Sequence, residues 1–79
     1  MGGNDKIFGG FGVDVIDAGL GTDFVDGGAG NDQIAGADGD DVLLGGVGTD
    51  TINGGDGDDL IEGDEDNDSL TGGAGDDKL

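Results

Sequence analysis

The sequence predicts an all-β repeat fold, in which very short strands stack on their own copies along one axis. Two observations predict it. An aspartate recurs every nine residues from Asp5 to Asp77, without a single insertion. An aliphatic side chain follows each of these aspartates by two residues, from Ile7 to Leu79. A disordered Gly/Asp-rich chain would drift in phase, so we interpret residues 1–79 as one repeat domain, with nine-residue units starting at 9, 18, 27, 36, 45, 54, 63 and 72.

Each unit divides into a turn and a strand. The first two complete units read GGFGVDVID and AGLGTDFVD. Positions 1 to 6 are rich in Gly, which accepts positive φ, and in Asp and Asn, which tolerate it. Positions 7 to 9 predict a three-residue strand with one inward side chain between two outward ones. Two units then make one coil of 18 residues, and parallel stacking of about four coils closes the backbone hydrogen bonds.

The composition excludes several classes of function. The chain has no His and no Cys, which removes a thiol nucleophile, a His general base and a zinc finger. Two Lys or Arg against 20 Asp or Glu leave nothing to hold a nucleic acid or an anionic membrane. No apolar run is long enough for membrane insertion, and the N-terminus lacks the apolar region of a signal peptide. The lone Ser69 has no base partner, so we expect no enzyme.

The net charge of -18 and the 22 glycines also oppose folding. A chain this acidic and this rich in glycine buries too little apolar surface to offset the entropy that ordering costs. We therefore expect the chain to be unfolded, or nearly so, without cations. Carboxylates are the ligands of hard cations such as Ca²⁺, which takes six to eight oxygens at flexible geometry, whereas Mg²⁺ demands a tighter octahedron.

The register G-G-x-G-x-D-x-U-x, where U is aliphatic, resembles the haemolysin-type calcium-binding nonapeptide repeat of RTX (repeats-in-toxin) proteins. The resemblance extends from Gly2 to Leu79. It implies a right-handed parallel β-roll, Ca²⁺ as the bound ion, folding induced by calcium, and a secreted, extracellular protein exported by the type I route. It also implies that backbone carbonyls of the glycines at positions 2 and 4 complete the ligand shell.

Because two units make one coil, each loop lies above the loop two units earlier. We therefore expect about seven Ca²⁺ ions, between residues 5/23, 23/41, 41/59 and 59/77 on one edge and 14/32, 32/50 and 50/68 on the other. The expected aspartate ligands are Asp5, Asp14, Asp23, Asp32, Asp41, Asp50, Asp59, Asp68 and Asp77. The glycines that the resemblance adds are Gly10, Gly12, Gly19, Gly21, Gly28, Gly30, Gly39, Gly46, Gly48, Gly55, Gly57, Gly73 and Gly75.

The pattern is broken at a few positions. Ala37 and Asp64 replace the glycine of position 2, and Asp66 replaces the glycine of position 4. The unit 63–71 is unusually acidic, so its loop is expected to be distorted, to carry an extra-acidic site, or to fray. Position 5 varies, with an apolar Val13 in one unit, and we expect it to contribute backbone at most.

The outward strand positions sort onto two unlike faces. One face is small and polar, whereas the other carries an apolar stripe formed by Phe8, Phe24, Val42, Leu44 and Leu60. Such a stripe is typical of a surface that packs against a neighbouring domain, a second roll or a protein partner, although single outward apolar residues are also common without function. An ice-binding or adhesive surface is the alternative function, because Asn31, Thr49 and Asn67 form a short rank along one edge.

Overall fold

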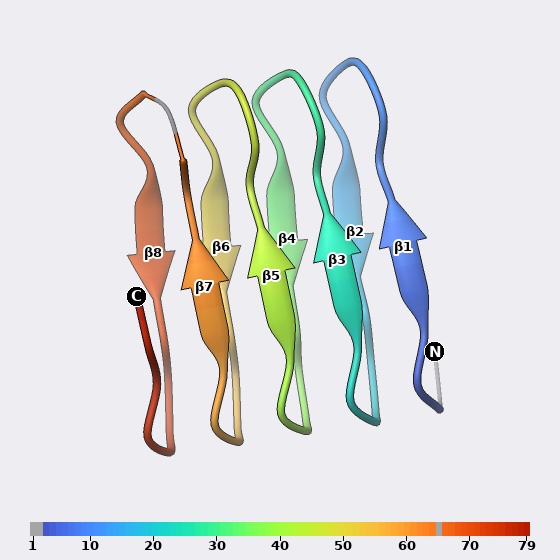
Figure 1. Cartoon of the computed structure of the whole chain (residues 1–79), viewed down its shortest axis with the longest axis vertical. Helices are drawn as coiled ribbons and strands as arrows, with labels where there is room; N and C mark the ends of the chain where they lie inside the picture. The colour runs from blue at the N-terminus through green and yellow to red at the C-terminus, as the bar shows by residue number, and fades with distance from the viewer. Residues whose placement is uncertain (1–2, 65) are drawn as a thin grey trace.

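The computed structural model describes residues 3–64 and 66–79, and these form a stack of short strands joined by loops (Figure 1). Every strand has three residues and occupies positions 7 to 9 of its unit, which confirms the predicted division into turn and strand. The strands are β1 (Lys6–Phe8), β2 (Val15–Asp17), β3 (Phe24–Asp26), β4 (Gln33–Ala35), β5 (Val42–Leu44), β6 (Thr51–Asn53), β7 (Leu60–Glu62) and β8 (Ser69–Thr71).

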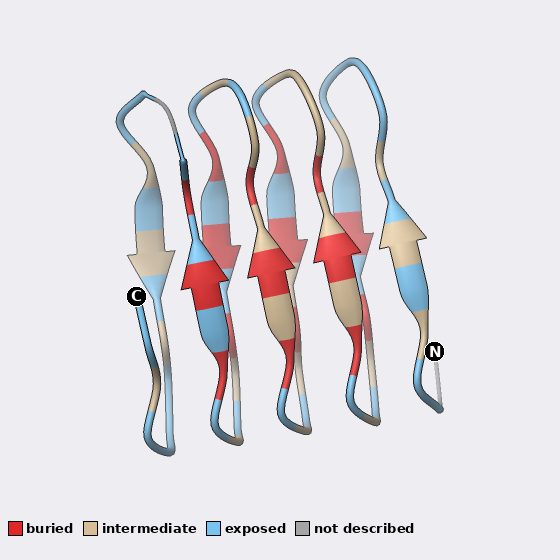
Figure 2. Cartoon of the chain, viewed as in Figure 1, coloured by how far each residue is buried: buried red, intermediate tan, exposed pale blue. Residues whose placement is uncertain are grey.

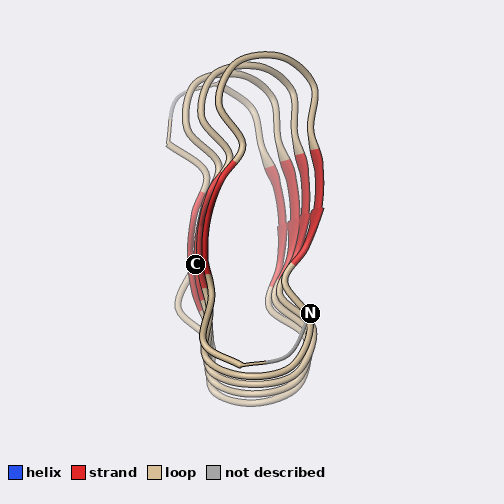
Figure 3. Ribbon diagram, turned by 90° about the vertical axis from the view of Figure 1, so that its right-hand side faces the viewer, coloured by secondary structure: helices blue, strands red, loops and turns tan. Residues whose placement is uncertain are grey.

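The strands form two parallel sheets that face each other across a narrow interior (Figure 3). One sheet has the order β1-β3-β5-β7 and the other β2-β4-β6-β8. Each strand pairs with the strand two units later, as Ile7 does with Val25, so two units make one coil. In Figure 1 the near strands run upward, the far strands run downward and the chain advances to the left, which makes the coil right-handed. The predicted parallel β-roll of about four coils is confirmed.

Loops close the roll at two edges, the upper and the lower edge in Figure 1. The upper loops, residues 9–14, 27–32, 45–50 and 63–68, follow the strands of the β1 sheet. The lower loops, residues 18–23, 36–41, 54–59 and 72–77, follow the strands of the β2 sheet. Each loop therefore lies directly over the loop two units earlier, as the period of the sequence requires.

The core lies between the sheets and consists of Ala18 and the aliphatic residues from the middle of the strands; the inner coils carry the buried positions (Figure 2). Parallel strands bury their central residue only where a neighbouring coil covers it, so the end coils are less buried. Ile7 and Leu70 are accordingly only partly buried, and Leu79 is 67% exposed beyond a lone bridge between Leu60 and Lys78. The buried core consists of Ile16, Ala18, Val25, Ile34, Leu43, Ile52 and Ile61.

Positive φ is the rule at positions 2 and 4 of every described unit, and glycine occupies almost all of them. The three exceptions are the substitutions seen in the sequence: Ala37 at 72°, Asp64 at 67° and Asp66 at 75°. Asp tolerates this left-handed region better than Ala does, because its short polar side chain can bond locally. Ala37 is therefore the most strained of these turns.

The apolar stripe lies on the outer face of the β1 sheet, in two rows. Phe24, Val42 and Leu60 stand directly opposite one another and form a continuous row, which Lys6 precedes. Phe8 and Leu44 belong to the second row, where Asp26 separates them. Phe8 reaches the first row through its ring, whose centroid lies 6.3 Å from that of Phe24. The Lys6 ammonium lies 5.9 Å from the Phe24 ring centroid, within cation–π range.

The substitution Ala37→Gly should stabilise the folded chain by about 1 kcal/mol, because it removes the Cβ that the left-handed conformation disfavours. Urea unfolding, followed by circular dichroism in saturating calcium, measures the change. Ala29→Gly is the matched control, since Ala29 lies in a loop of the same kind without positive φ. That control should lower stability by about 0.5 kcal/mol, because glycine adds unfolded-state entropy. Equal effects of both substitutions would contradict the strain at Ala37.

Candidate metal sites

The aspartates at position 6 form two columns inside the roll, one behind the upper loops and one behind the lower loops. The five inner members, Asp23, Asp32, Asp41, Asp50 and Asp59, are at most 2% exposed. In each column, the Oδ1 atom of an aspartate accepts the backbone N–H of the aspartate two units earlier. Asp41 Oδ1 lies 2.8 Å from Asp23 N, and all seven such bonds measure 2.7 to 2.9 Å.

In the five inner aspartates, and in Asp5 and Asp14 at the start of the columns, the Oδ2 atom has no hydrogen-bond partner. The unpaired, buried Oδ2 atoms belong to Asp5, Asp14, Asp23, Asp32, Asp41, Asp50 and Asp59. A buried polar atom without a partner is costly, and an ionised carboxylate is far costlier than a neutral group. Seven such oxygens in register therefore call for a cation beside each of them.

The backbone places further oxygens beside these carboxylates. At Gly27, the point where a Cβ would lie is 2.7 Å from Asp32 Oδ2 and 2.9 Å from the carbonyl oxygen of Gly45 in the next coil. Gly36 repeats this arrangement, with Asp41 Oδ2 at 2.6 Å and the Gly54 carbonyl oxygen at 2.7 Å. Position 1 thus brings an orphaned carboxylate oxygen and a carbonyl oxygen together beside its Cα, in the space that a side chain would fill.

Carbonyls at positions 2 and 4 also face the adjacent coil. A methyl group added at Gly28 or Gly30 would collide with the carbonyl oxygen of Gly10 or Gly12, respectively. These glycines have positive φ, and their carbonyl oxygens lie against the next coil. The sequence-based expectation placed its glycine ligands at these two positions. The carbonyls of position 1 are additional candidates that the sequence pattern did not single out.

This donor set fits Ca²⁺. In residues 3–64 and 66–79, no group of three or more acidic side chains gathers at one point. A bound ion would therefore take few carboxylates and complete its shell with carbonyl oxygens, and no nitrogen or sulfur donor contributes. Such an all-oxygen shell of mixed geometry is what Ca²⁺ accepts, whereas Mg²⁺ demands a near-ideal octahedron and keeps its waters.

The electrostatics of the columns show the cost of this arrangement. Burial is the main cause that raises the pKa of Asp41 to about 6. The neighbouring charges of Asp59, Asp23 and Asp40 act in the same direction, and the Asp23 N–H acts against them. Burial is also the main cause that raises the pKa of Asp50 and that of Asp59. These carboxylates resist ionisation in the folded chain unless a positive charge joins them.

Side chains at position 5 also take part in the stack, contrary to the expectation that this position contributes backbone at most. Asn31 Oδ1 accepts the Thr49 N–H at 2.9 Å, and Asp40 Oδ1 accepts the Asp58 N–H at 2.8 Å. The rank of Asn31 and Thr49, considered above as an external surface, therefore uses one of its polar atoms for a hydrogen bond between coils. The sequence signal for this role is the recurrence of Asn or Asp at residues 4, 31, 40, 58, 67 and 76.

The acidic unit 63–71 keeps its strand and its register. Strand β8 pairs with β6, and Asp68 Oδ1 accepts the Asp50 N–H at 2.7 Å. Asp66 Oδ2 accepts the Gly48 N–H at 3.2 Å, a contact that the usual glycine could not make. Glu65, the remaining acidic residue of interest in this unit, lies outside the described residues.

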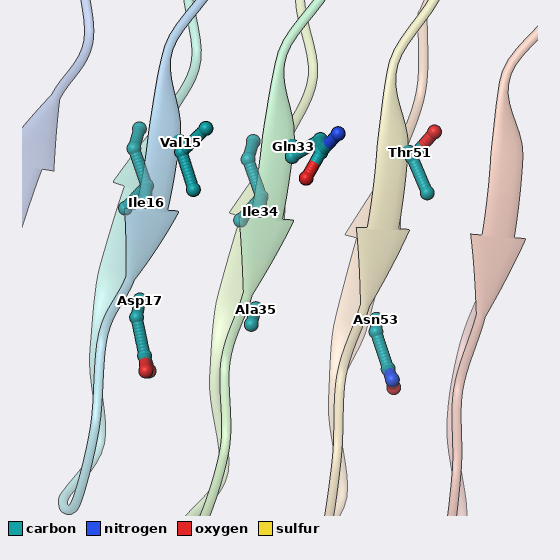
Figure 4. A pocket seen from close by; sticks show the side chains of 8 residues that line it. All are labelled: Val15, Ile16, Asp17, Gln33, Ile34, Ala35, Thr51 and Asn53. Atoms are coloured by element: carbon teal, nitrogen blue, oxygen red, sulfur yellow. The ribbon is translucent and has the colours of Figure 1, made fainter.

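Away from the loops, a shallow depression of about 330 Å³ lies on the outer face of the β2 sheet (Figure 4). Asp17 is the one acidic residue that lines it, and Gln33, Thr51 and Asn53 supply neutral polar groups. These side chains do not form a nucleophile–base pair. No helix in the described part of the chain is long and apolar enough to cross a membrane.

Comparison with known families identifies the same repeat. The family model described as "RTX calcium-binding nonapeptide repeat (4 copies)" matches residues 1–25, 21–52 and 44–79, which together span the chain. Comparison with curated proteins and with solved structures gave no match.

The metal-free chain should gain folded structure as the pH falls from 7 to about 4. The pKa of Asp41 is about 6 in the folded chain against 3.8 in a model peptide, so the folded state binds more protons over this range. Its stability is therefore greatest below the lower value and is lost as the pH rises through the higher one. Circular dichroism in the presence of a chelator measures the change.

Asp17→Asn serves as the control for this experiment, because Asp17 is exposed on the outer face. It should leave the pH profile unchanged, whereas Asp41→Asn should shift folding toward neutral pH. A β signal that stays constant or falls on acidification would contradict the burial of these carboxylates.

Proposed function

The chain belongs to the RTX calcium-binding nonapeptide repeat family, and we propose that it is a structural module that binds about seven Ca²⁺ ions between its stacked loops and folds as it binds them. Calcium binding in a structural repeat is the property of the family. The number of ions, their ligands, the coupling to folding and the place where the module works are the proposal.

The observation that carries the proposal is the set of seven buried Oδ2 atoms without a partner. We infer that a cation between superposed loops neutralises the charge beside each of these atoms. We assign each ion to a pair of position-6 aspartates from successive coils, together with carbonyl oxygens of positions 2 and 4. The position-1 carbonyls that approach Oδ2 at Gly27 and Gly36 are further candidate ligands.

The charge of the ions supports the coupling to folding. About seven Ca²⁺ ions supply roughly +14, against the formal net charge of -18. A ligand at ten times its Kd stabilises the state that binds it by about 1.4 kcal/mol, so seven sites would contribute about 10 kcal/mol. This contribution is comparable to the whole free energy of unfolding of an ordinary small domain, about 5–15 kcal/mol.

We place the module outside the cell. Extracellular calcium modules have Kd values of about 10⁻⁴–10⁻³ M, far above cytosolic free calcium. A chain with such affinities stays unfolded in the cytosol and folds once it reaches an extracellular medium. Export in the unfolded state, by the type I route of RTX proteins, is compatible with the chain having no Cys that would need oxidation.

The role is structural rather than catalytic. The five inner carboxylates of the two columns accept a backbone N–H on one oxygen, and we assign their other oxygen to an ion. We favour calcium binding over the ice-binding or adhesive alternative, because Asn31 directs its Oδ1 into the stack. An ice-recrystallisation assay would detect that alternative.

We also propose that the apolar stripe docks against a neighbouring domain or a second roll. Support comes from the continuous row of Phe24, Val42 and Leu60, with Phe8 packed against Phe24. Phe8 remains 65% exposed and Leu60 37% exposed. Contiguous apolar side chains that are exposed to solvent are typical of a surface that binds another protein surface.

Calcium titration of the 79-residue chain should convert a disordered circular dichroism spectrum into a β spectrum, and magnesium at the same concentration should not. Asp41→Asn removes a charge that two ions share, so it should raise the calcium midpoint several-fold. Asp17→Asn, on the outer face, is its matched control and should leave the midpoint unchanged. A β spectrum that persists in a chelator at neutral pH would contradict the proposal.

Changing Phe24 and Leu44 together to Ser should leave the calcium midpoint unchanged and abolish self-association of the calcium-loaded chain. Sedimentation velocity measures the second effect. Thr51→Ser with Asn53→Ser, on the outer face of the opposite sheet, is the control and should not alter sedimentation. If the Phe24/Leu44 variant sediments as the wild type does, the stripe does not mediate self-association.

A further inference from the structure

Adjacent residues in stacked loops form a reciprocal pair of hydrogen bonds. Asp40 Oδ1 at position 5 accepts the N–H of Asp58 in the next coil at 2.8 Å. One residue further along, the direction reverses: Asp59 Oδ1 at position 6 accepts the N–H of Asp41 at 2.9 Å. The two bonds close a ring between the coils, which we call a closed clamp.

Closed clamps occur at four of the loop pairs, and the residue at position 5 of the earlier loop determines whether a pair has one. At each of them the earlier loop has Asn or Asp at position 5. The closed pairs are 4–5 with 22–23, 31–32 with 49–50, 40–41 with 58–59, and 58–59 with 76–77.

The other loop pairs keep only the bond at position 6. The pair 13–14 with 31–32 has Val13 at position 5, which offers no acceptor, and only Asp32 Oδ1 links its loops, by accepting the Asp14 N–H at 2.9 Å. The pair 22–23 with 40–41 has Thr22 there and likewise keeps one bond in the described part of the chain. At the pair 49–50 with 67–68, Asp66 supplies a different second bond, to Gly48.

The clamp acts on the groups that would hold the ion. It ties the residue directly before the position-6 aspartate to the neighbouring coil, so in the folded chain both walls of the gap are held by hydrogen bonds as well as by the ion. Where the clamp is open, the ion itself must order the loops, and the entropy of that ordering subtracts from its binding free energy. A ligand shell held by its own supporting bonds binds more tightly than a loose one.

We infer that position 5 is the positioning residue of these repeats, and that Asn or Asp there raises the calcium affinity of the loop pair it closes. The inference rests on the proposed function. Pairs with a closed clamp then fill at lower calcium concentration than the open pairs beginning at residues 13 and 22. Affinity is thereby graded along the roll, although the aspartate column itself is uniform.

The test is a calcium titration of the ¹⁵N-labelled chain, in which the amide signals at positions 5 and 6 report each loop pair separately. In the wild type, the amides of Asp41 and Asp58, which form one closed clamp, should reach half-change at lower calcium than those of Asp14 and Asn31, which belong to the open pair. The substitution Val13→Asn supplies the missing acceptor without changing charge. It should lower the midpoint of its own loop pair about fivefold, the effect of one hydrogen bond, and protect the Asn31 amide from exchange.

Three further variants exclude a merely structural effect. Val47→Asn is the same substitution at an exposed loop residue, but at position 3, so it should leave every midpoint unchanged. Asn31→Val should raise the midpoint of the pair 31–32 with 49–50 alone, and Asn31→Asp should restore it. Because general destabilisation would move all loops together, a local shift identifies the clamp.

The outcomes distinguish a failure of the role of position 5 from a failure of calcium binding. A single midpoint shared by all loops, or a shift of all loops together in Val13→Asn, overturns the role of position 5 and leaves calcium binding intact. Loop amides that do not respond to calcium at all overturn the proposed function, and the inference with it.

Discussion

Buried columns of like charge are the constraint on which the rest of this structure depends. Asp23, Asp41 and Asp59 stand one above another inside the coil, with exposed fractions of at most 2%. Burial, with a smaller contribution from the charges of Asp59 and Asp23, raises the pKa of Asp41 to about 6. The glycines of the loops follow from this constraint. At Gly27 and Gly36, for example, the absence of a side chain leaves room beside an Oδ2 atom and a backbone oxygen of the next coil, so these loops can surround a cation rather than a side chain.

The sequence predicts the architecture well because the period of nine constrains every layer at once. Once two units make a coil, the strand positions, the inward aliphatic residues and the aspartate columns all follow from the register. The departures at Ala37, Asp64 and Asp66 were visible in the sequence, and all three proved to carry the positive φ that glycine would have supplied. Only the ends deviate from the pattern, since Leu79 matches the aliphatic column yet has no coil above it in the described chain.

The loop contacts were harder to predict, for a physical reason. Whether Asn31 points into the stack or toward solvent depends on the distance between coils and on the backbone direction at residue 49, which no local pattern contains. The variation at position 5 also conceals its role, because Val13 and Thr22 occupy the same column as Asp40. The position-1 carbonyls could not be predicted, because every residue has a backbone carbonyl whatever its side chain. The only sequence signal is the small residue that makes room beside the carbonyl.

The strict register of two units per coil has a consequence for how such a chain tolerates insertions and deletions. Each coil contacts only its immediate neighbours, so removing or duplicating a whole coil leaves every remaining interface as it was. Losing a single residue is different, because side chains alternate between the inside and the outside of a strand. Each aliphatic residue after the deletion would then face water, and the polar residue next to it would face the core. Lengthening by tandem duplication is therefore nearly neutral for this architecture, whereas a one-codon deletion in mid-chain is close to a truncation.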